Sequence, residues 1–285
     1  MMINRRSFLL SASAFAASPA FAKEAPPALP AYERDSGGRI GLYAKNLTSG
    51  AELAWRAHDR FVMCSTFKAS LAACVLARVD RGQDRLDATV PYTQKDLLAY
   101  APVAKENLSK GALSVGEMAK AIVELSDNTC ANLLLARVGG PQALTKFWRD
   151  HGDSISRLDH DEPELNRTPL GKLEDTTTPR AMATTLQRFV LGDALQAGSR
   201  AQLTEWMVNC KTGANRLRAG LPTSWKIGDK TGNNGKDAAG DIAVVWPAPD
   251  RPVIIAAYTR GGNPTSTQLN TVFKAIGGMV GQQLG

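Results

Sequence analysis

The stretch DIAVVWPAPDRPVIIAAYTR, residues 241–260, contains two short apolar runs separated by a turn. The runs at 241–247 and 252–260 have the length of strands, and the sequence PAPDR between them is typical of a turn. Together they predict an antiparallel hairpin. Near the other end of the chain, RIGLYAKNL at 39–47 alternates moderately between apolar and polar residues and predicts another strand.

The long region between these strands has helical patterns. Ser114 followed by Glu117 forms a capping box, and apolar residues at helical spacing come after it. Further helices are expected from about Thr129 to Val138, where glycines follow, from Thr178-Pro179 onward, and over STQLNTVFKAIGGMVGQQL at 266–284.

This order of elements predicts an α+β fold. The two ends of the chain would build one antiparallel sheet flanked by helices, from residues 23–60 and 206–285, and residues 61–205 would form an inserted all-α lobe. A cleft between the two lobes is the expected place for an active site.

Composition and charge narrow the class of protein. Of 285 residues, 44% are apolar and 21% charged, as in a packed globular protein. The formal net charge is +7, and it is +5 for the chain without its first 22 residues, whose charged side chains are Arg5 and Arg6. The remaining lysines and arginines are scattered among acidic residues. Nucleic-acid binding therefore has little support. After residue 22 the sequence has no apolar run long enough to span a bilayer, so no membrane anchor is expected.

The first 22 residues, MMINRRSFLLSASAFAASPAFA, predict an export signal. They combine paired arginines, an apolar run and a small-x-small ending. NRRSFLL fits a twin-arginine signal, and an ordinary secretory signal with two arginines is the alternative. We therefore expect a mature chain that begins near Lys23 and works in the periplasm or outside the cell.

The stretch MCSTFKAS at 63–70 places Lys68 three residues after Ser65. On a helix these positions share a face, so the lysine amine can reach the serine hydroxyl. A serine needs such a base to become a nucleophile, and free N–H groups at a helix start favour negative charge beside it. The pattern is too short to define a function alone.

Three further motifs follow in order: SDN at 126–128, EPELN at 162–166 and KTG at 230–232. S-x-x-K, S-D-N and K-T-G together are the signature of class A β-lactamases and penicillin-binding proteins. The chain resembles a class A serine β-lactamase over nearly all of its mature length, including YAPV at 100–103 and DTTTP at 175–179. EPELN separates this class from the transpeptidases because it supplies a second general base for water.

The resemblance implies a role for each motif residue. Ser65 would attack the lactam carbonyl, with the backbone N–H groups of Ser65 and Asn233 as the oxyanion hole. Lys68 or Glu162 would accept the first proton, and Glu162 would activate water for deacylation. The resemblance further implies that Ser126, helped by Lys230, would protonate the lactam nitrogen and that Asn166 would hold the water. The substrate carboxylate would bind Thr231 and Lys230, in the motif that ends at Gly232. Asn128 would bind the substrate amide side chain, and Tyr100 would form an apolar wall at the entrance.

KTG occurs twice, at 211–213 and at 230–232. The alternation in SWKIGDKTG favours an edge strand and hence the second copy as the site. The first copy lies at the expected end of a helix and is interpreted as structural. The arginine that often follows KTG in the family is missing from KDAAGDIAV. We assign its carboxylate-binding role to Arg216, with Arg218 as the less favoured choice.

Two departures from the family concern His160 and Cys64. His160 stands where the family usually has an arginine that pairs with the acid at Asp175, which predicts a looser loop and a wider substrate range, especially at alkaline pH. In carbapenem-hydrolysing members the cysteine at Cys64 is bridged to one shortly after KTG; here that place holds Asn234, so this bridge cannot form. Carbapenem hydrolysis is thus possible without being implied.

The four cysteines and the two remaining histidines favour neither a cofactor site nor a metal site. The four cysteines, Cys64, Cys74, Cys130 and Cys210, could form two disulfides, but buried free thiols are favoured for most of them. His58 and His151 are expected to be surface or packing residues, because no cluster of metal ligands accompanies them.

The sequence therefore predicts a monomeric enzyme that opens small-molecule β-lactams through an acyl-serine intermediate. The alternatives are a penicillin-binding transpeptidase or carboxypeptidase, which EPELN argues against, and a β-lactam sensor that acylates without turnover. A sensor should carry a membrane anchor or signalling segment, and no such segment is evident after residue 22.

Overall fold

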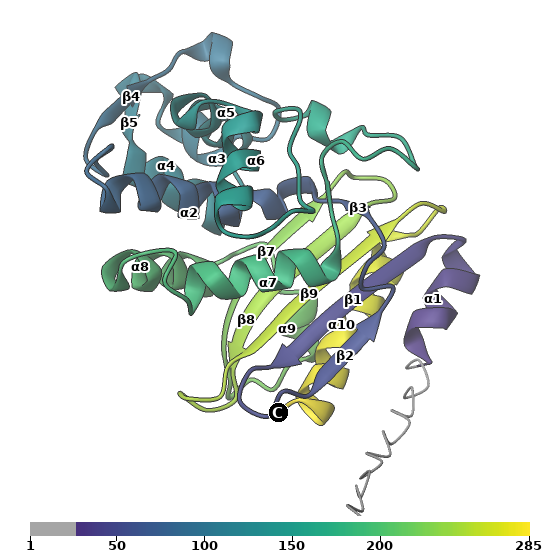
Figure 1. Cartoon of the computed structure of the whole chain (residues 1–285). Coiled ribbons are helices and arrows are strands. Elements are labelled where there is room, and N and C mark those ends of the chain that lie inside the picture. Colours follow the sequence, from purple (N-terminus) through teal and green to yellow (C-terminus); the bar gives the residue numbers. More distant parts are fainter. Residues whose placement is uncertain (1–26) are drawn as a thin grey trace, which may run out of the picture.

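The computed structural model describes residues 27–285, so the export signal expected at 1–22 lies outside the described residues. Its centre is a five-stranded sheet with the strand order β2-β1-β9-β8-β7, in which every neighbouring pair is antiparallel (Figure 1). The strands are β1 (Arg39–Asn46), β2 (Glu52–Trp55), β7 (Lys226–Asn233), β8 (Ala239–Trp246) and β9 (Val253–Arg260).

The sheet joins the two ends of the chain. β8 and β9 form the expected hairpin, and β1 pairs with β9 from Arg39 opposite Arg260 to Asn46 opposite Val253. β7 forms the edge of the sheet, which confirms the position expected for the second KTG. The α+β class with a sheet built from both chain ends is therefore confirmed; the lobe boundaries near residues 60 and 205 stay a prediction.

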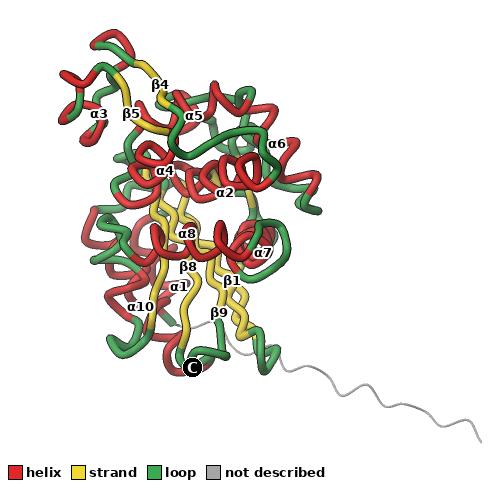
Figure 2. Tube along the Cα trace, turned by 90° about the vertical axis from the view of Figure 1, so that its left-hand side faces the viewer, coloured by secondary structure: helices red, strands yellow, loops and turns green. Residues whose placement is uncertain are grey.

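Helices cover both faces of the sheet. On one face, α1 (Ala28–Ser36), α9 (Leu217–Gly220) and α10 (Ser266–Gln283) enclose an apolar cluster that includes Leu29 and Phe273. On the other face, α7 (Pro179–Val190) packs on β1, β8 and β9, and α8 (Ala197–Val208) packs on β7. In Figure 2, α7 and α8 lie between the sheet and the remaining helices.

The remaining helices surround α2 (Phe67–Asp80). Every residue of α2 from Phe67 to Ala77 is buried, because α4, α5, α6, α7 and α8 pack around it. A helix that is buried on nearly all sides is a core helix, and it forms a rigid base for the residues at its N-terminal end.

The other elements are β3 (Phe61–Val62), β4 (Thr89–Pro91), β5 (Ala112–Ser114), β6 (Thr176–Thr177), α3 (Pro102–Glu106), α4 (Val115–Glu124), α5 (Asn128–Val138), α6 (Pro141–Asp150) and the 3₁₀ turns η1 (Cys64–Thr66), η2 (Gln94–Asp96), η3 (Leu108–Lys110) and η4 (Glu164–Asn166).

The local signals for helix ends are confirmed. Ser114 and Glu117 form both hydrogen bonds of the capping box, at 3.1 and 2.7 Å. Thr178 Oγ1 caps α7 by accepting from the N–H of Ala181, and Gly139 ends α5 in the left-handed conformation with φ of 108°. The tail helix is α10.

The cysteines also match the favoured expectation. Cys64, Cys74, Cys130 and Cys210 are all buried free thiols. Across residues 27–285, none of the helices combines the length and apolar character that crossing a bilayer requires.

We predict that Ser114→Ala lowers the free energy of unfolding by about 1 kcal/mol, because it removes a capping bond of α4. In a chain of this size this corresponds to a fall in Tm of about 2–4 °C. Thermal unfolding followed by circular dichroism measures it. Ser109→Ala is the control, since Ser109 is exposed and its hydroxyl makes no hydrogen bond within the described residues. Equal Tm values for the two variants would contradict the prediction.

Candidate active site

Ser65 lies in the 3₁₀ turn η1, immediately before α2, and is half-buried. The preceding residue, Cys64, has φ of 46°, a left-handed conformation that costs energy for a non-glycine residue. Ser65 Oγ donates to Glu162 Oε1 at 3.0 Å. The sequence analysis left open whether Lys68 or Glu162 serves Ser65 as the base; in the structure the direct hydrogen-bond partner of the serine is Glu162.

Lys68 is fully buried in the first turn of α2. Its Nζ donates to Ser126 O at 2.9 Å and to Asn128 Oδ1, and it lies 3.1 Å from Glu162 Oε1. Burial lowers the pKa of Lys68, and the neighbouring Glu162 carboxylate opposes this shift. The three acceptors come from the SDN and EPELN motifs, so Lys68 joins them at one point.

Ser126 connects the two buried lysines of the site, Lys68 and Lys230. Its hydroxyl lies 3.4 Å from Lys68 Nζ and 3.1 Å from Lys230 Nζ, and its backbone has a left-handed φ of 62°. Lys230 is fully buried on β7, and burial lowers its pKa to about 8. SDN and KTG therefore meet at the Ser126 hydroxyl.

Glu162 is held at three points. Asn132 on α5 donates to the Glu162 carbonyl at 2.8 Å and accepts from the Glu162 N–H at 2.9 Å. Asn166 Nδ2 donates to Glu162 Oε2 at 2.7 Å. The sequence analysis missed Asn132; its signal was the position four residues after Asn128, on the same face of a helix.

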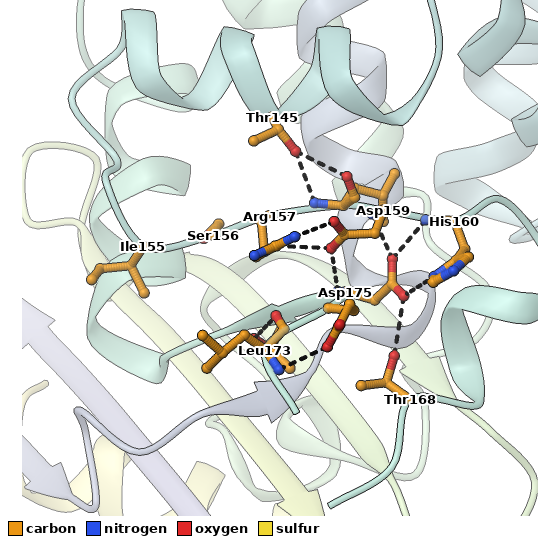
Figure 3. A network of polar contacts seen from close by, with 12 residues as sticks. Thr145, Ile155, Ser156, Arg157, Asp159, His160, Thr168, Leu173 and Asp175 are labelled. Atoms are coloured by element: carbon orange, nitrogen blue, oxygen red, sulfur yellow. Dashed lines mark hydrogen bonds and ion pairs between the residues drawn. The ribbon is translucent and has the colours of Figure 1, made fainter. Parts of the chain in front are cut away.

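The loop that carries Glu162 is anchored on the buried carboxylate of Asp175 (Figure 3). Asp175 Oδ1 accepts the N–H groups of Asp159 and His160 at 2.8 and 3.0 Å, and Oδ2 accepts from Thr168 at 3.1 Å. Asp159 Oδ2 accepts in return from the Asp175 N–H at 3.0 Å and from Arg157 Nε at 2.9 Å. Both ends of the loop are thus tied together.

His160 also takes part in this anchor. Its Nδ1 lies 2.7 Å from Asp175 Oδ2, and its side chain is 51% exposed. The hydrogen bond to Asp175 raises the pKa of His160. The histidine therefore pairs with Asp175 as the family arginine would. The ion pair exists only while His160 is protonated, so the predicted loosening of the loop depends on pH.

Gly232 brings the edge strand β7 close to Ser65. A Cβ atom at Gly232 would lie 2.6 Å from the backbone nitrogen of Ser65 and 2.9 Å from Cys64 Cβ. Only glycine allows this approach. The backbone of Asn233, the next residue, therefore continues β7 past Ser65, where an oxyanion hole was expected.

The two candidate arginines differ in their partners. Arg218 donates to the fully buried Asp229 and to the carbonyls of Val208 and Ile227. Arg216 Nη1 donates to two strand carbonyls, Gly232 O at 2.8 Å and Gly240 O at 2.7 Å. Arg218 is engaged with a carboxylate, whereas Arg216 has its guanidinium beside KTG.

The remaining candidates lie at the edge of the site or away from it. Tyr100 is 51% exposed, and its hydroxyl donates to Leu125 O at 3.1 Å, beside SDN. His58 is exposed, and His151 packs against Phe147 and Phe189. In the described part of the chain, no three His, Cys, Asp or Glu side chains are grouped to hold a metal ion.

Comparison with known proteins agrees with this geometry. The model of the "Beta-lactamase enzyme family" matches residues 27–284. Beta-lactamase L2 of Stenotrophomonas maltophilia is 45% identical over 90% of this chain and 84% of its own length. The carbapenem-hydrolyzing beta-lactamase KPC of Klebsiella oxytoca is 42% identical over 89% of this chain and 86% of its own length.

Solved structures give the same result. An ancestral (GNCA) class A β-lactamase superposes with a TM-score of 0.85 at 47% identity, covering 89% of this chain and 97% of its own. A β-lactamase from Xanthomonas campestris pv. campestris superposes with a TM-score of 0.87 at 44% identity, covering 90% and 96%.

The fold and the serine-centred site define a hydrolase of the β-lactamase class. The chain belongs to the class A β-lactamase family and hydrolyses β-lactams, the activity that underlies resistance to these antibiotics.

We predict that His160→Arg stabilises the protein only at alkaline pH. Because the folded-state pKa of His160 is raised, its ion pair contributes fully below the ordinary pKa of 6.5 and is lost as pH rises through the raised value. The Tm of the arginine variant should match the parent at about pH 5.5 and exceed it at about pH 9, since arginine keeps its charge. His58→Arg is the control, and a Tm difference independent of pH would rule the prediction out.

Proposed function

We propose that the enzyme hydrolyses penicillins and cephalosporins by a covalent acyl-serine route with Ser65 as the nucleophile. The observation that carries this proposal is the contact between Ser65 Oγ and Glu162 Oε1 at 3.0 Å, in a site where two buried lysines flank Ser126. A carboxylate at this distance can accept the hydroxyl proton as the oxygen attacks the lactam carbonyl.

We infer that Glu162, rather than Lys68, takes the first proton. Lys68 Nζ has three close acceptors, Ser126 O, Asn128 Oδ1 and Glu162 Oε1, which match the three donors of an ammonium group. Ser126 Oγ lies further away, at 3.4 Å. A lysine in this setting acts as a cation that stabilises negative charge near Ser65. Its lowered pKa leaves it able to return a proton later in the reaction.

The proposed oxyanion hole consists of the backbone N–H groups of Ser65 and Asn233. Its support is the close approach of Gly232 to the Ser65 nitrogen. When the lactam C–N bond breaks, the Ser126 hydroxyl would give its proton to the nitrogen. Ser126 is suited to this role because Lys68 and Lys230 both lie at its hydroxyl and can replace that proton. A Lys68 that has given up its proton would then take the one on Glu162 Oε1, 3.1 Å away, so that Glu162 is ionised again before deacylation.

Recognition of the substrate is proposed to use both sides of the cleft. Thr231, Lys230 and Arg216 would bind its carboxylate, since they bring positive charge and a hydroxyl to the KTG strand. Asn128 would bind its amide side chain, and Tyr100 would form the outer wall.

Deacylation is proposed to use Glu162 and Asn166 to bind and deprotonate a water. Asn166 Oδ1 is buried and accepts no hydrogen bond within residues 27–285, while its Nδ2 holds Glu162 Oε2 at 2.7 Å. The amide oxygen is therefore available to accept from a water whose other proton goes to Glu162. The water oxygen attacks the ester carbonyl, and Ser65 recovers its proton as the product leaves.

We also propose that the chain is exported by a twin-arginine signal, works in the periplasm and acts as a monomer. The support for export is the sequence of residues 1–22 alone.

We predict that Glu162→Gln lowers kcat for nitrocefin by about 10²–10⁴-fold, the usual loss of a general base. Residues 23–285 would be assayed by stopped flow, and mass spectrometry would seek an acyl adduct on Ser65. Glu164→Gln is the matched control, since Glu164 is exposed and lies two residues further along the same loop. Normal turnover by Glu162→Gln would refute its role, and a single burst without turnover by the parent would refute the hydrolytic mechanism.

We predict that kcat/KM falls as pH rises above about 8, because Lys230 loses its charge there. Deprotonation weakens the attraction for the substrate carboxylate and the supply of a proton to Ser126. Lys230→Arg, which stays charged, should shift this alkaline limb upward. A limb at the same pH in both proteins would assign it to another group.

A further inference from the structure

The first KTG copy contacts the second. Residues 211–213 follow the end of α8, as the sequence analysis expected, and turn back toward β7. The Lys211 N–H donates to Glu124 O at 2.9 Å, two residues before Ser126. A Cβ atom at Gly213 would lie 1.6 Å from Asp229 Oδ2, so the loop is pressed against the strand that carries Lys230.

Three side chains form a continuous chain at this contact. Thr212 Oγ1 lies 2.5 Å from Thr231 Oγ1, and Cys210 Sγ lies 3.3 Å from Thr212 Oγ1. Cys210 is buried and Thr212 half-buried. This series of hydrogen bonds therefore runs from the protein interior to Thr231 of the second KTG.

The direction of these hydrogen bonds decides what Thr231 can do. A hydroxyl has a single proton to donate, so Thr231 can donate to a carboxylate only if it does not donate to Thr212. Thr212 must then donate to Thr231, and it can accept in turn from the Cys210 thiol. Burial raises the pKa of Cys210, which keeps the thiol protonated as a donor.

We propose that Thr212 is a positioning residue for β-lactam hydrolysis: its hydroxyl donates to Thr231 Oγ1 and directs the Thr231 proton toward the substrate carboxylate. This rests on the carboxylate-binding role proposed above for Thr231. Each hydrogen bond in such a chain polarises the next, so the effect of Thr212 reaches the substrate without direct contact.

Loss of the Thr212 hydroxyl should weaken substrate binding and leave the chemical steps nearly unchanged. The hydrogen bonds of the Thr212 hydroxyl within residues 27–285 go to Cys210 and Thr231, not to Ser65 or Glu162. Acylation and deacylation of a bound substrate should therefore continue without this hydroxyl. The carboxylate contact exists in both the ground state and the transition state, so its loss raises KM more than it lowers kcat.

The test compares benzylpenicillin with its methyl ester, which lacks the anionic carboxylate. Thr212→Val should raise KM for benzylpenicillin about tenfold with kcat nearly unchanged, and should leave KM for the ester within about twofold. Thr212→Ser, which keeps the hydroxyl, should restore the parent value. Thr184→Val is the matched control, because the Thr184 hydroxyl bonds only within α7, to Arg180 O.

A Thr231→Val variant distinguishes the positioning role of Thr212 from the carboxylate-binding role of Thr231. If it weakens benzylpenicillin selectively while Thr212→Val does not, Thr212 has no positioning role. If Thr231→Val shows no selectivity for the acid, the carboxylate role of Thr231 itself is wrong. Equal losses for acid and ester in Thr212→Val, with a lower Tm, would mean that Thr212 is merely structural and would overturn the proposal.

Discussion

The burial of Lys68 is the constraint on which the rest of the site depends. An ammonium group taken out of water loses several kcal/mol of solvation unless it is paired and fully hydrogen-bonded. Lys68 and Glu162 have side chains that are 0% and 1% exposed, and the lysine also needs Ser126 and Asn128 as acceptors. Satisfying one cation therefore forces α2, the segment before α5 and the Glu162 loop to meet beside Ser65.

The second constraint is the edge of the sheet. β7 has no strand beyond it in the described structure, so its outer side is free to form one wall of the cleft. Gly232 permits close approach to Ser65, Lys230 reaches Ser126, and the 211–213 loop meets Thr231. In the proposed mechanism, β7 therefore contributes carboxylate recognition and a proton donor for Ser126, while the helices and the Glu162 loop contribute the nucleophile and the general base.

The Glu162 loop is held by contacts that are independent of pH and by one that depends on protonation. Asp175 is tied by two backbone N–H groups and Thr168 regardless of pH. His160 adds a bond that depends on protonation, in place of a permanently charged arginine. The loop geometry is therefore kept, whereas its stability is coupled to pH.

The sequence by itself determined strands β1, β7, β8 and β9, the capped starts of α4 and α7 and the motif residues, because hydrophobic periodicity, capping and short motifs are local properties. It also identified the second KTG as the edge-strand copy. Only the tertiary structure decided that Ser65 bonds to Glu162 rather than Lys68, that Asn132 clamps Glu162, and that Thr212 meets Thr231. These contacts join residues separated by 97, 30 and 19 positions. No local pattern encodes them, because they arise from how α2, α5 and β7 pack together.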